Sequence, residues 1–436
     1  MATFTIGIIG FGVLLVLIML RLPVALSMSL VGFIGFAILV APAQAMSMVA
    51  YQAYLAFTNY NYGAAIMFIL MGYIAANSGI SKILFQTLNV LLGHIRGGLA
   101  WATAIACAAF GAICGSTLAT TAAMGVIALP EMDKRNYDHA LSTGTVSVSG
   151  ILGTMIPPSI PLIVYGMTTM QSVSKLFAAT IVPGLCLMFT VMMTVSIICG
   201  IDKSKAPKYE KPPLKERIKR LFNSGTFEII FIFAFVLTGM GVGWFTPTEA
   251  GAVGAGAMLL VAVIRKRLTM KAFLKSLKDT TNTSAMVFLI VLGASIFGSF
   301  ISVSRVPSVL NDIIAQSSVP GLIVIILLML LQLVLGCIMD GMVVLVLTLP
   351  IVYPIAMSMG YDPIWLGPMM VLMAGIGMIT PPVGMNAYIV NGINPSVKLD
   401  VIFRGCWPFI LSSMILVILL CVFPDIITFL PKLLGA

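Results

Sequence analysis

Charged residues are scarce in this chain of 436 residues: Asp, Glu, Lys and Arg make up 9% of it, whereas a soluble globular domain carries about 25%. Hydrophobic residues make up 60%. Apolar runs of roughly 20 residues, the length that a spanning helix needs, recur from one end to the other. The composition excludes a soluble globular domain and predicts an all-α polytopic membrane protein. Its first run, Phe4–Leu20, lacks a positive start and a cleavage site, so we expect a spanning helix and not a signal peptide.

Side chains that bind metals or act as nucleophiles form no recognisable cluster. The seven cysteines stand in apolar runs without C-x-x-C spacing, and the two histidines, His94 and His139, stand in basic loops. No nucleophile elbow or Walker motif is present, and the glycines of 251–256 are not followed by Lys-Ser or Lys-Thr. The net charge of +10 comes from loops beside membrane spans and does not indicate a nucleic-acid partner. We therefore expect no enzyme activity, no bound cofactor and no use of ATP by this chain.

Two similar stretches each place a Pro-Pro pair inside an apolar segment, at 153–166 and at 377–392. Proline removes a backbone donor and clashes with the preceding turn, so a helix must break at each pair. A broken helix within a membrane is tolerated only where the break is buried in protein or lines a polar cavity. Two breaks at matching places indicate a transporter built from a repeat.

The strongest shift in composition divides the chain into two halves. Residues 201–225 hold eight cations and three prolines, so we interpret them as a basic cytoplasmic linker. Each half is expected to contain scaffold helices, one of which lies in the membrane interface (44–61 and 266–283), a re-entrant helical hairpin, a broken helix and a final helix. A basic loop is expected at 82–96, before the first hairpin. The expected ranges are 4–80, 97–130, 140–170 and 176–200 within the first repeat, 1–200, and 226–304, 320–357, 363–391 and 401–423 within the second, 226–436.

The distribution of positive charge agrees with this arrangement. If each hairpin enters and leaves on one side, the cytoplasmic loops hold all 24 Lys and Arg residues except Lys175, Arg305 and Lys432. Both termini are then periplasmic. The first hairpin opens from the cytoplasm and the second from the periplasm, so the repeat is inverted. Two full crossings in place of either hairpin would satisfy the charges equally well.

Small and polar residues at the hairpin tips and helix breaks would meet if the tips approach the breaks. They offer hydroxyls, freed carbonyls, an amide and a carboxylate, which suit a hard cation such as sodium, while helix N-termini at the tips favour an anion. We predict that sodium binds Gly115, Ser116, Thr117, Gly153, Pro157, Asp340, Gly341, Gly377, Thr380 and Pro382. We predict that an anionic substrate contacts Ser116, Thr154, Ser159, Thr380 and Asn386.

These residues also have structural interpretations. Ser and Thr in membrane helices often bond to a backbone carbonyl or to a neighbouring helix. A charged Asp340 at the bilayer centre costs roughly 3 kcal/mol, which favours a functional role, but its tip could also reach the periplasmic interface and be solvated. We expect Glu249 to cap a helix and not to bind substrate.

Four motifs together resemble the large membrane subunit of tripartite ATP-independent periplasmic (TRAP) transporters. They are Phe110–Gly125, Gly153–Ser159, Thr246–Ala255 and Gly377–Asn386, and the resemblance extends over nearly the whole chain. The tip Ile113–Leu118 keeps a Gly-Ser core but departs from the Ser-Gly-Ser type that is frequent in the family.

The resemblance implies uptake of a small organic anion, a carboxylate or sulfonate, across the bacterial inner membrane by an elevator mechanism driven by sodium. It also implies two partners: a small four-helix membrane subunit, which we expect as a separate chain, and a soluble periplasmic binding protein. The alternative is a stand-alone sodium/anion symporter of the divalent-anion type. A channel or a membrane enzyme is a third class, but no paired catalytic groups stand in the spans.

Overall fold

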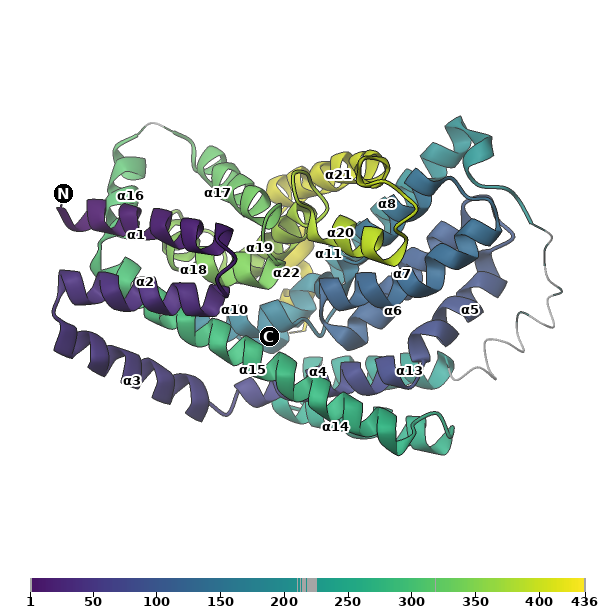
Figure 1. The fold of residues 1–436 in the computed structure, drawn as a ribbon, viewed down its shortest axis with the longest axis horizontal. Coiled ribbons are helices and arrows are strands. Elements are labelled where there is room, and N and C mark those ends of the chain that lie inside the picture. The colour runs from purple at the N-terminus through teal and green to yellow at the C-terminus, as the bar shows by residue number, and fades with distance from the viewer. Residues whose placement is uncertain are drawn as a thin grey trace.

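The computed structural model describes residues 2–434 except 210, 212, 214–216, 218–225 and 318. Every secondary-structure element within that part of the chain is a helix, so the predicted all-α fold is confirmed. Figure 1 shows the helices side by side in an elongated bundle, with α1 to α3 at one end and α5 to α7 at the other.

The first half begins with five helices, continues with a helical hairpin, α6 and α7, and ends with an interrupted helix and a long one. Their bounds are α1 Ala2–Met19, α2 Val24–Leu39, α3 Pro42–Thr58, α4 Tyr62–Asn77, α5 Ile80–Leu92, α6 Gly98–Cys114, α7 Thr117–Lys134, α8 His139–Ser149, α9 Leu152–Met155, α10 Ile160–Thr169, α11 Val173–Ile201 and the 3-10 turn η1 Lys203–Lys205.

The second half follows a similar order, with its hairpin formed by α17 and α18 and its interrupted helix by α19 and α20. The bounds are α13 Thr226–Gly241, α14 Pro247–Ile264, α15 Met270–Val303, α16 Val306–Gln316, α17 Gly321–Gly336, α18 Gly341–Ser358, α19 Pro363–Gly377, α20 Met385–Ile393, α21 Leu399–Val422 and α22 Asp425–Leu433.

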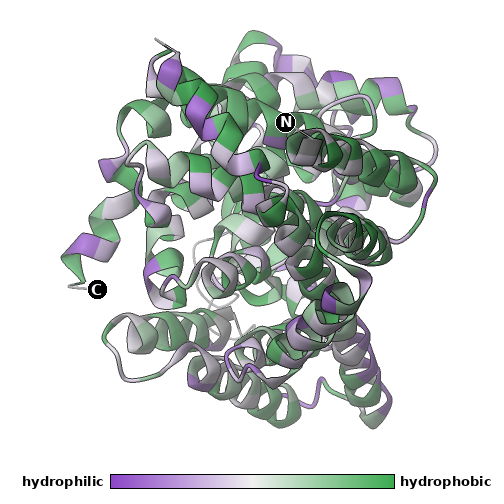
Figure 2. Ribbon diagram, turned by 90° about the vertical axis from the view of Figure 1, so that its left-hand side faces the viewer, coloured by the Kyte–Doolittle hydropathy of each residue, from purple (hydrophilic) through white to green (hydrophobic). Residues whose placement is uncertain are grey.

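The described helices are apolar enough for a membrane protein. Six of them, with α8 to α10 counted as one, are long and apolar enough to cross a bilayer, or seven if the bent pair α4 and α5 forms one span. Figure 2 shows hydrophobic residues along most of the helices in that view. Many large hydrophobic side chains are exposed, among them Ile9, Leu30 and Phe57. This distribution is expected where lipid, and not water, surrounds most of the surface.

Some elements differ from the sequence-based expectation. The predicted basic loop between Lys82 and Arg96 contains helix α5, which turns by 64° from α4. The expected interfacial stretch 266–283 and the span 284–304 largely join in one helix, α15, because no proline interrupts them. Short helices α16 and α22, which the sequence analysis did not foresee, follow α15 and α21. Much of the predicted linker lies outside the described residues.

Glycines allow close packing between helices of the first half and helices of the second half. Helix α2 packs on α15, where a Cβ built on Gly32 would lie 2.7 Å from the backbone nitrogen of Phe297. Helix α14 packs on α4, where a Cβ on Gly251 would lie 2.9 Å from the Met67 Cβ. Side chains larger than hydrogen would force each helix pair apart, so these glycines allow the close approach.

Candidate functional site

The tips of the two hairpins line one cavity of about 850 Å³. The first tip contributes Gly115, Ser116 and Thr117 to its wall, and the second contributes Asp340 and Gly341. The two tips are more than 200 residues apart in the sequence, so the fold alone brings them together. This cavity is therefore the candidate site, and it contains five of the predicted sodium ligands.

The first tip is a tight turn between two helices. Gly115 ends α6 with φ of +63°, a left-handed conformation that glycine adopts without steric cost. Ser116 has an extended backbone and caps α7, with its Oγ accepting a hydrogen bond from the Ala119 N–H at 3.5 Å. The N-terminus of α7 thus begins at the cavity wall, where its partial positive charge favours an anion.

The second tip presents a carboxylate at the start of a helix. Asp340 caps α18, and its Oδ1 accepts a hydrogen bond from the Met342 N–H at 3.0 Å. The side chain is partly buried and lines the cavity. A carboxylate is favourable at a helix N-terminus, and carboxylate oxygens are ligands that hard cations prefer.

The first helix break lies directly against the first tip. The Thr117 and Thr154 hydroxyl oxygens are 2.9 Å apart, and Thr154 also lines the cavity. A Cβ built on Gly153 would lie 2.6 Å from the Ser116 carbonyl oxygen and would also clash with Thr120 Oγ1. Only glycine fits there, so the backbone of the break reaches the backbone of the tip.

Other predicted residues of the first break lie behind the cavity wall. Pro157 and Ser159 are buried and are not among the lining residues, and Ser159 Oγ has no hydrogen-bond partner within the described structure. The Ile160 N–H donates to the Gly115 carbonyl at 3.4 Å. The loop after the Pro157–Pro158 pair, whose peptide bond is cis, is thus joined to the tip.

The second break lies against the second hairpin but outside the cavity lining. Gly377 packs on α17, where its Cβ would lie 2.7 Å from the Gly336 Cα, and the Gly384 N–H donates to the Cys337 carbonyl at 2.9 Å. The Thr380 hydroxyl donates to the Ile376 carbonyl at 2.8 Å, and Pro382 is exposed. The structure therefore does not bring the side chains of Thr380 and Pro382 to the cavity.

Asn386 occupies a different place from the one predicted for a substrate contact. It is fully buried, and its Nδ2 donates to the Ser147 carbonyl at 3.0 Å, which joins α20 to α8 of the other half. Its Oδ1 has no hydrogen-bond partner in the described residues. Thr120 Oγ1, which was not among the predicted ligands, is also buried and has no hydrogen-bond partner that meets the distance criteria among the described residues.

Another part of the cavity wall contains polar residues from a segment that the sequence predicts to be an interfacial helix. Lys275, Asp279, Asn282 and Thr283 of α15 line the cavity, as does Asn77 of α4. Their spacing of three or four residues places the α15 set on one helical face. The same pattern is typical of a helix on a membrane surface, so periodicity could not distinguish the two positions.

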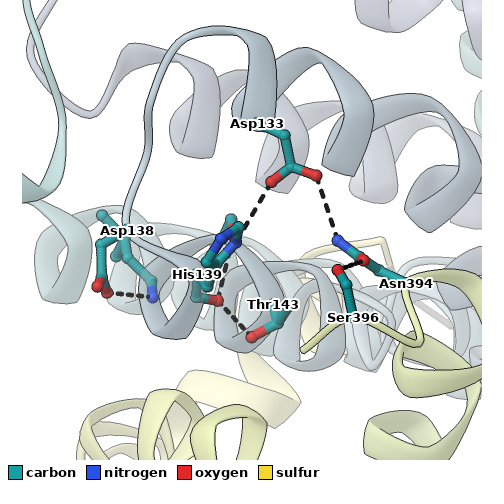
Figure 3. A network of polar contacts seen from close by, with 8 residues as sticks. Asp133, Asp138, His139, Thr143, Asn394 and Ser396 are labelled. Carbon is teal, nitrogen blue, oxygen red and sulfur yellow. Dashed lines mark hydrogen bonds and ion pairs between the residues drawn. The ribbon is translucent and has the colours of Figure 1, made fainter. Parts of the chain in front are cut away.

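A second polar network lies at the end of the first hairpin (Figure 3). Asp133 of α7 is 3.4 Å from His139 Nδ1 at the start of α8, and its Oδ2 accepts a hydrogen bond from Asn394 Nδ2 at 3.2 Å. None of the three lines the cavity. The network joins the hairpin of the first half to the loop after α20.

The chain is similar in fold to a solved transporter structure. It superposes on the YdaH transporter of Alcanivorax borkumensis with a TM-score of 0.64, over 88% of this chain and 89% of that one. The sequences are 12% identical, so the likeness concerns the fold alone.

Comparison of sequences identifies the family, which the likeness of fold does not. The chain is 32% identical over 376 residues to the sialic acid TRAP transporter large permease protein SiaM of Vibrio cholerae, covering 86% of this chain and 87% of the relative. It is 30% identical over 445 residues to the C4-dicarboxylate TRAP transporter large permease protein DctM of Rhodobacter capsulatus, covering 98% and 99%. Residues 11–426 match the family described as the tripartite ATP-independent periplasmic transporter, DctM component. The chain therefore belongs to the DctM family, and it is a multi-pass transporter subunit, not an enzyme.

Proposed function

We propose that this TRAP large permease subunit carries a small organic anion inward together with sodium ions, by movement of the hairpins and broken helices past the other helices. The observation that carries the proposal is the shared cavity, because both hairpin tips and Thr154 of the first break line it. Such a place offers hydroxyls, backbone oxygens and a carboxylate to a cation, and helix N-termini to an anion.

Two groups of residues are proposed to hold sodium. Around the first tip, the group is Gly115, Ser116, Thr117, Gly153 and Pro157. The backbone contact of Gly153 with the Ser116 carbonyl supports it, and the unpartnered Thr120 Oγ1 beside Gly153 adds a further oxygen. Around the second tip, the group is Asp340, Gly341, Gly377, Thr380 and Pro382. Within it, the cavity position of Asp340 and Gly341 is the stronger support.

The substrate is proposed to be a carboxylate or sulfonate. Relatives of this chain are named for sialic acid and for C4-dicarboxylates, both of which are organic acids. Ser116 and Thr154 line the cavity and are the best-placed contacts, whereas the proposed contacts of Ser159, Thr380 and Asn386 have no support from the cavity lining. The N-termini of α7 and α18 supply partial positive charge to the anion.

We propose the movement and the partners because this chain belongs to the DctM family. An elevator would move the two hairpins and broken helices as one body, and the Asn386–Ser147 and Asp133–Asn394 hydrogen bonds between the halves support such a body. Each net positive charge carried inward gains about 2.3 kcal/mol per 100 mV of membrane potential. The proposed partners are a small membrane subunit and a periplasmic binding protein that delivers the substrate.

Sodium binding can be tested without knowledge of the substrate. We would purify the chain with its small subunit and compare its melting temperature in sodium chloride and in potassium chloride at equal ionic strength. A ligand that binds only the folded state adds about 2.7 kcal/mol of stability at 100 times its dissociation constant. We expect a sodium-specific rise in the parent that is reduced in Ser116→Ala.

Equal melting temperatures in both salts would count against sodium as the coupling ion. An undiminished rise in Ser116→Ala would remove the first tip from the sodium site. The stand-alone alternative has its own readout, because uptake of an organic acid into vesicles that contain this chain and no binding protein would favour it.

A further inference from the structure

The cavity continues well beyond the hairpin tips along one face of α15. Its lining includes residues of this helix from Lys275 to Ile290, a separation of 15 residues, which corresponds to about 22 Å. The face is polar at its beginning, with Lys275, Asp279 and Asn282, and apolar further on, at Val287 and Ile290. An anion that leaves the tips toward the beginning of α15 must pass the polar part.

Side-chain contacts establish where the first tip stands along α15. Helix α4 runs antiparallel to α15, since Asn77 Nδ2 donates to Ser276 Oγ at 3.0 Å while the hydroxyl oxygens of Tyr73 and Thr283 are 2.7 Å apart. Gly72, next to Tyr73, faces the tip, and its Cβ would lie 3.0 Å from the Cys114 Cα. The first tip is therefore near the level of Thr283. Lys275 lies eight residues, about 12 Å, further toward the start of the helix.

A positive charge distinguishes the Lys275 end of the cavity from the end at the hairpin tips. Among the described residues that line it, Lys275 is the one cation, whereas Asp279 and Asp340 are carboxylates. Its neighbours on the same helix, Lys271 and Lys278, do not line the cavity. The Lys275 ammonium is exposed and flexible, and it acts as a point charge for an anion.

We propose that Lys275, with the side-chain amide of Asn282, forms a second and weaker anion-binding site through which the carboxylate of the substrate leaves the hairpin tips. This site rests on the proposed function, because it assumes that the transported substrate is an anion. Asp279, one turn from Lys275, and solvent screening keep the binding weak. A weak contact suits a release step, because a tight one would retain the substrate.

A reporter cysteine can measure the potential at this end of the cavity. Ala76 lines the cavity beside Asn77, so Ala76→Cys places a thiol near Lys275. We would compare its rates of modification by an anionic and a cationic methanethiosulfonate reagent in the complex with the small subunit, with Cys114, a free cysteine that also lines the cavity, replaced by alanine. We expect Lys275→Gln to lower the ratio of the anionic to the cationic rate about threefold, as the loss of a nearby unit charge in water predicts. Lys275→Arg should keep the ratio, and Lys278→Gln, the matched control outside the cavity, should leave it unchanged.

Anion binding is tested with the same reporter. Succinate and N-acetylneuraminate, used as probes, should slow modification of the Ala76→Cys thiol in the background that retains Lys275 and not in Lys275→Gln. An unchanged rate ratio in Lys275→Gln, an equal fall in Lys278→Gln, or no protection by either probe would overturn the site. Failure of the proposed function has a different signature, because it would remove the sodium-specific rise in melting temperature without altering the rate ratio.

Discussion

Gly111 and Gly153 lie in direct backbone contact: a Cβ built on Gly111 would stand 2.9 Å from the Gly153 backbone nitrogen. Gly336 and Gly377 make the same kind of contact in the second half, at 2.7 Å from a Gly377 Cβ to the Gly336 Cα. Gly111 and Gly336 each stand four residues before their hairpin tip, at Gly115 and Asp340. Gly153 and Gly377 each stand four residues before their Pro-Pro pair. The spacing supports the proposal that the halves are repeats.

This glycine contact predicts a loss of stability on substitution. Gly111→Ala should lower the free energy of unfolding by about 1–3 kcal/mol, because the added methyl group has no space beside a backbone that cannot move aside. Thermal unfolding in detergent, in complex with the small subunit, would measure it. The control is Gly256→Ala in α14, where no atom of the described residues lies within 4 Å of the added Cβ. It should be neutral or stabilising by up to about 1 kcal/mol. Equal effects of the two variants would contradict the packing argument.

Asp340 and Asp362 allow a matched test of the second tip. Both cap a helix through Oδ1, with hydrogen bonds of 3.0 Å from Met342 N–H and 2.7 Å from Ile364 N–H, but only Asp340 lines the cavity. We expect Asp340→Asn to raise the half-saturating sodium concentration for uptake about tenfold, which is about 1.4 kcal/mol, because it removes a charged oxygen ligand. Asp362→Asn should leave this concentration unchanged. Similar changes in both variants would mean that Asp340 serves only as a cap.

The contacts of Asn386 predict that its replacement lowers stability, whereas the sequence indicates a contact with the substrate. Asn386→Leu would leave the Ser147 carbonyl, buried and 239 residues away in the chain, without its donor, so stability should fall by about 1–3 kcal/mol. Asn391→Leu is the control, since its amide donates locally to the Val397 carbonyl at 2.8 Å in a half-buried position, and it should cost less. Chemical unfolding would compare them. A folded, fully stable Asn386→Leu protein with impaired uptake would instead restore the predicted role in substrate binding.

The parts of the site that were predictable from sequence depend on local chemistry. Proline cannot donate within a helix in any context, so the breaks at Pro157–Pro158 and Pro381–Pro382 were visible without a structure. The tip at Gly115–Ser116 was visible because a glycine and a helix-capping serine separate two apolar segments.

The remaining parts depend on which elements meet in space. The polar face from Lys275 to Thr283 has the periodicity of a surface helix. It becomes a cavity wall only because α15 packs on α4 and borders the cavity that the hairpin tips also line. Asn386 follows a helix break, as a ligand would, but the fold turns it toward α8. Lys82 and Arg96 indicate a loop, but the segment between them has the strongly amphipathic sequence of a helix and forms α5.

The last prediction concerns the contact between α4 and the first hairpin. A Cβ on Gly72 would lie 2.9 Å from the Ile113 carbonyl oxygen and 3.0 Å from the Cys114 Cα, so glycine is required for the position that the hairpin occupies here. If the hairpin moves past α4 during transport, Gly72→Val should destabilise the hairpin position seen in this structure more than the position reached after the movement. Uptake should then slow at least tenfold. Modification of a cysteine at Ala76 should also slow, because the cavity would be open for less of the time. The control is Gly392→Val, since a Cβ at Gly392 would lie more than 4 Å from every atom in the described part of the chain. A Gly72→Val protein that is stable and takes up substrate at the parental rate would show that the hairpin does not need this close approach.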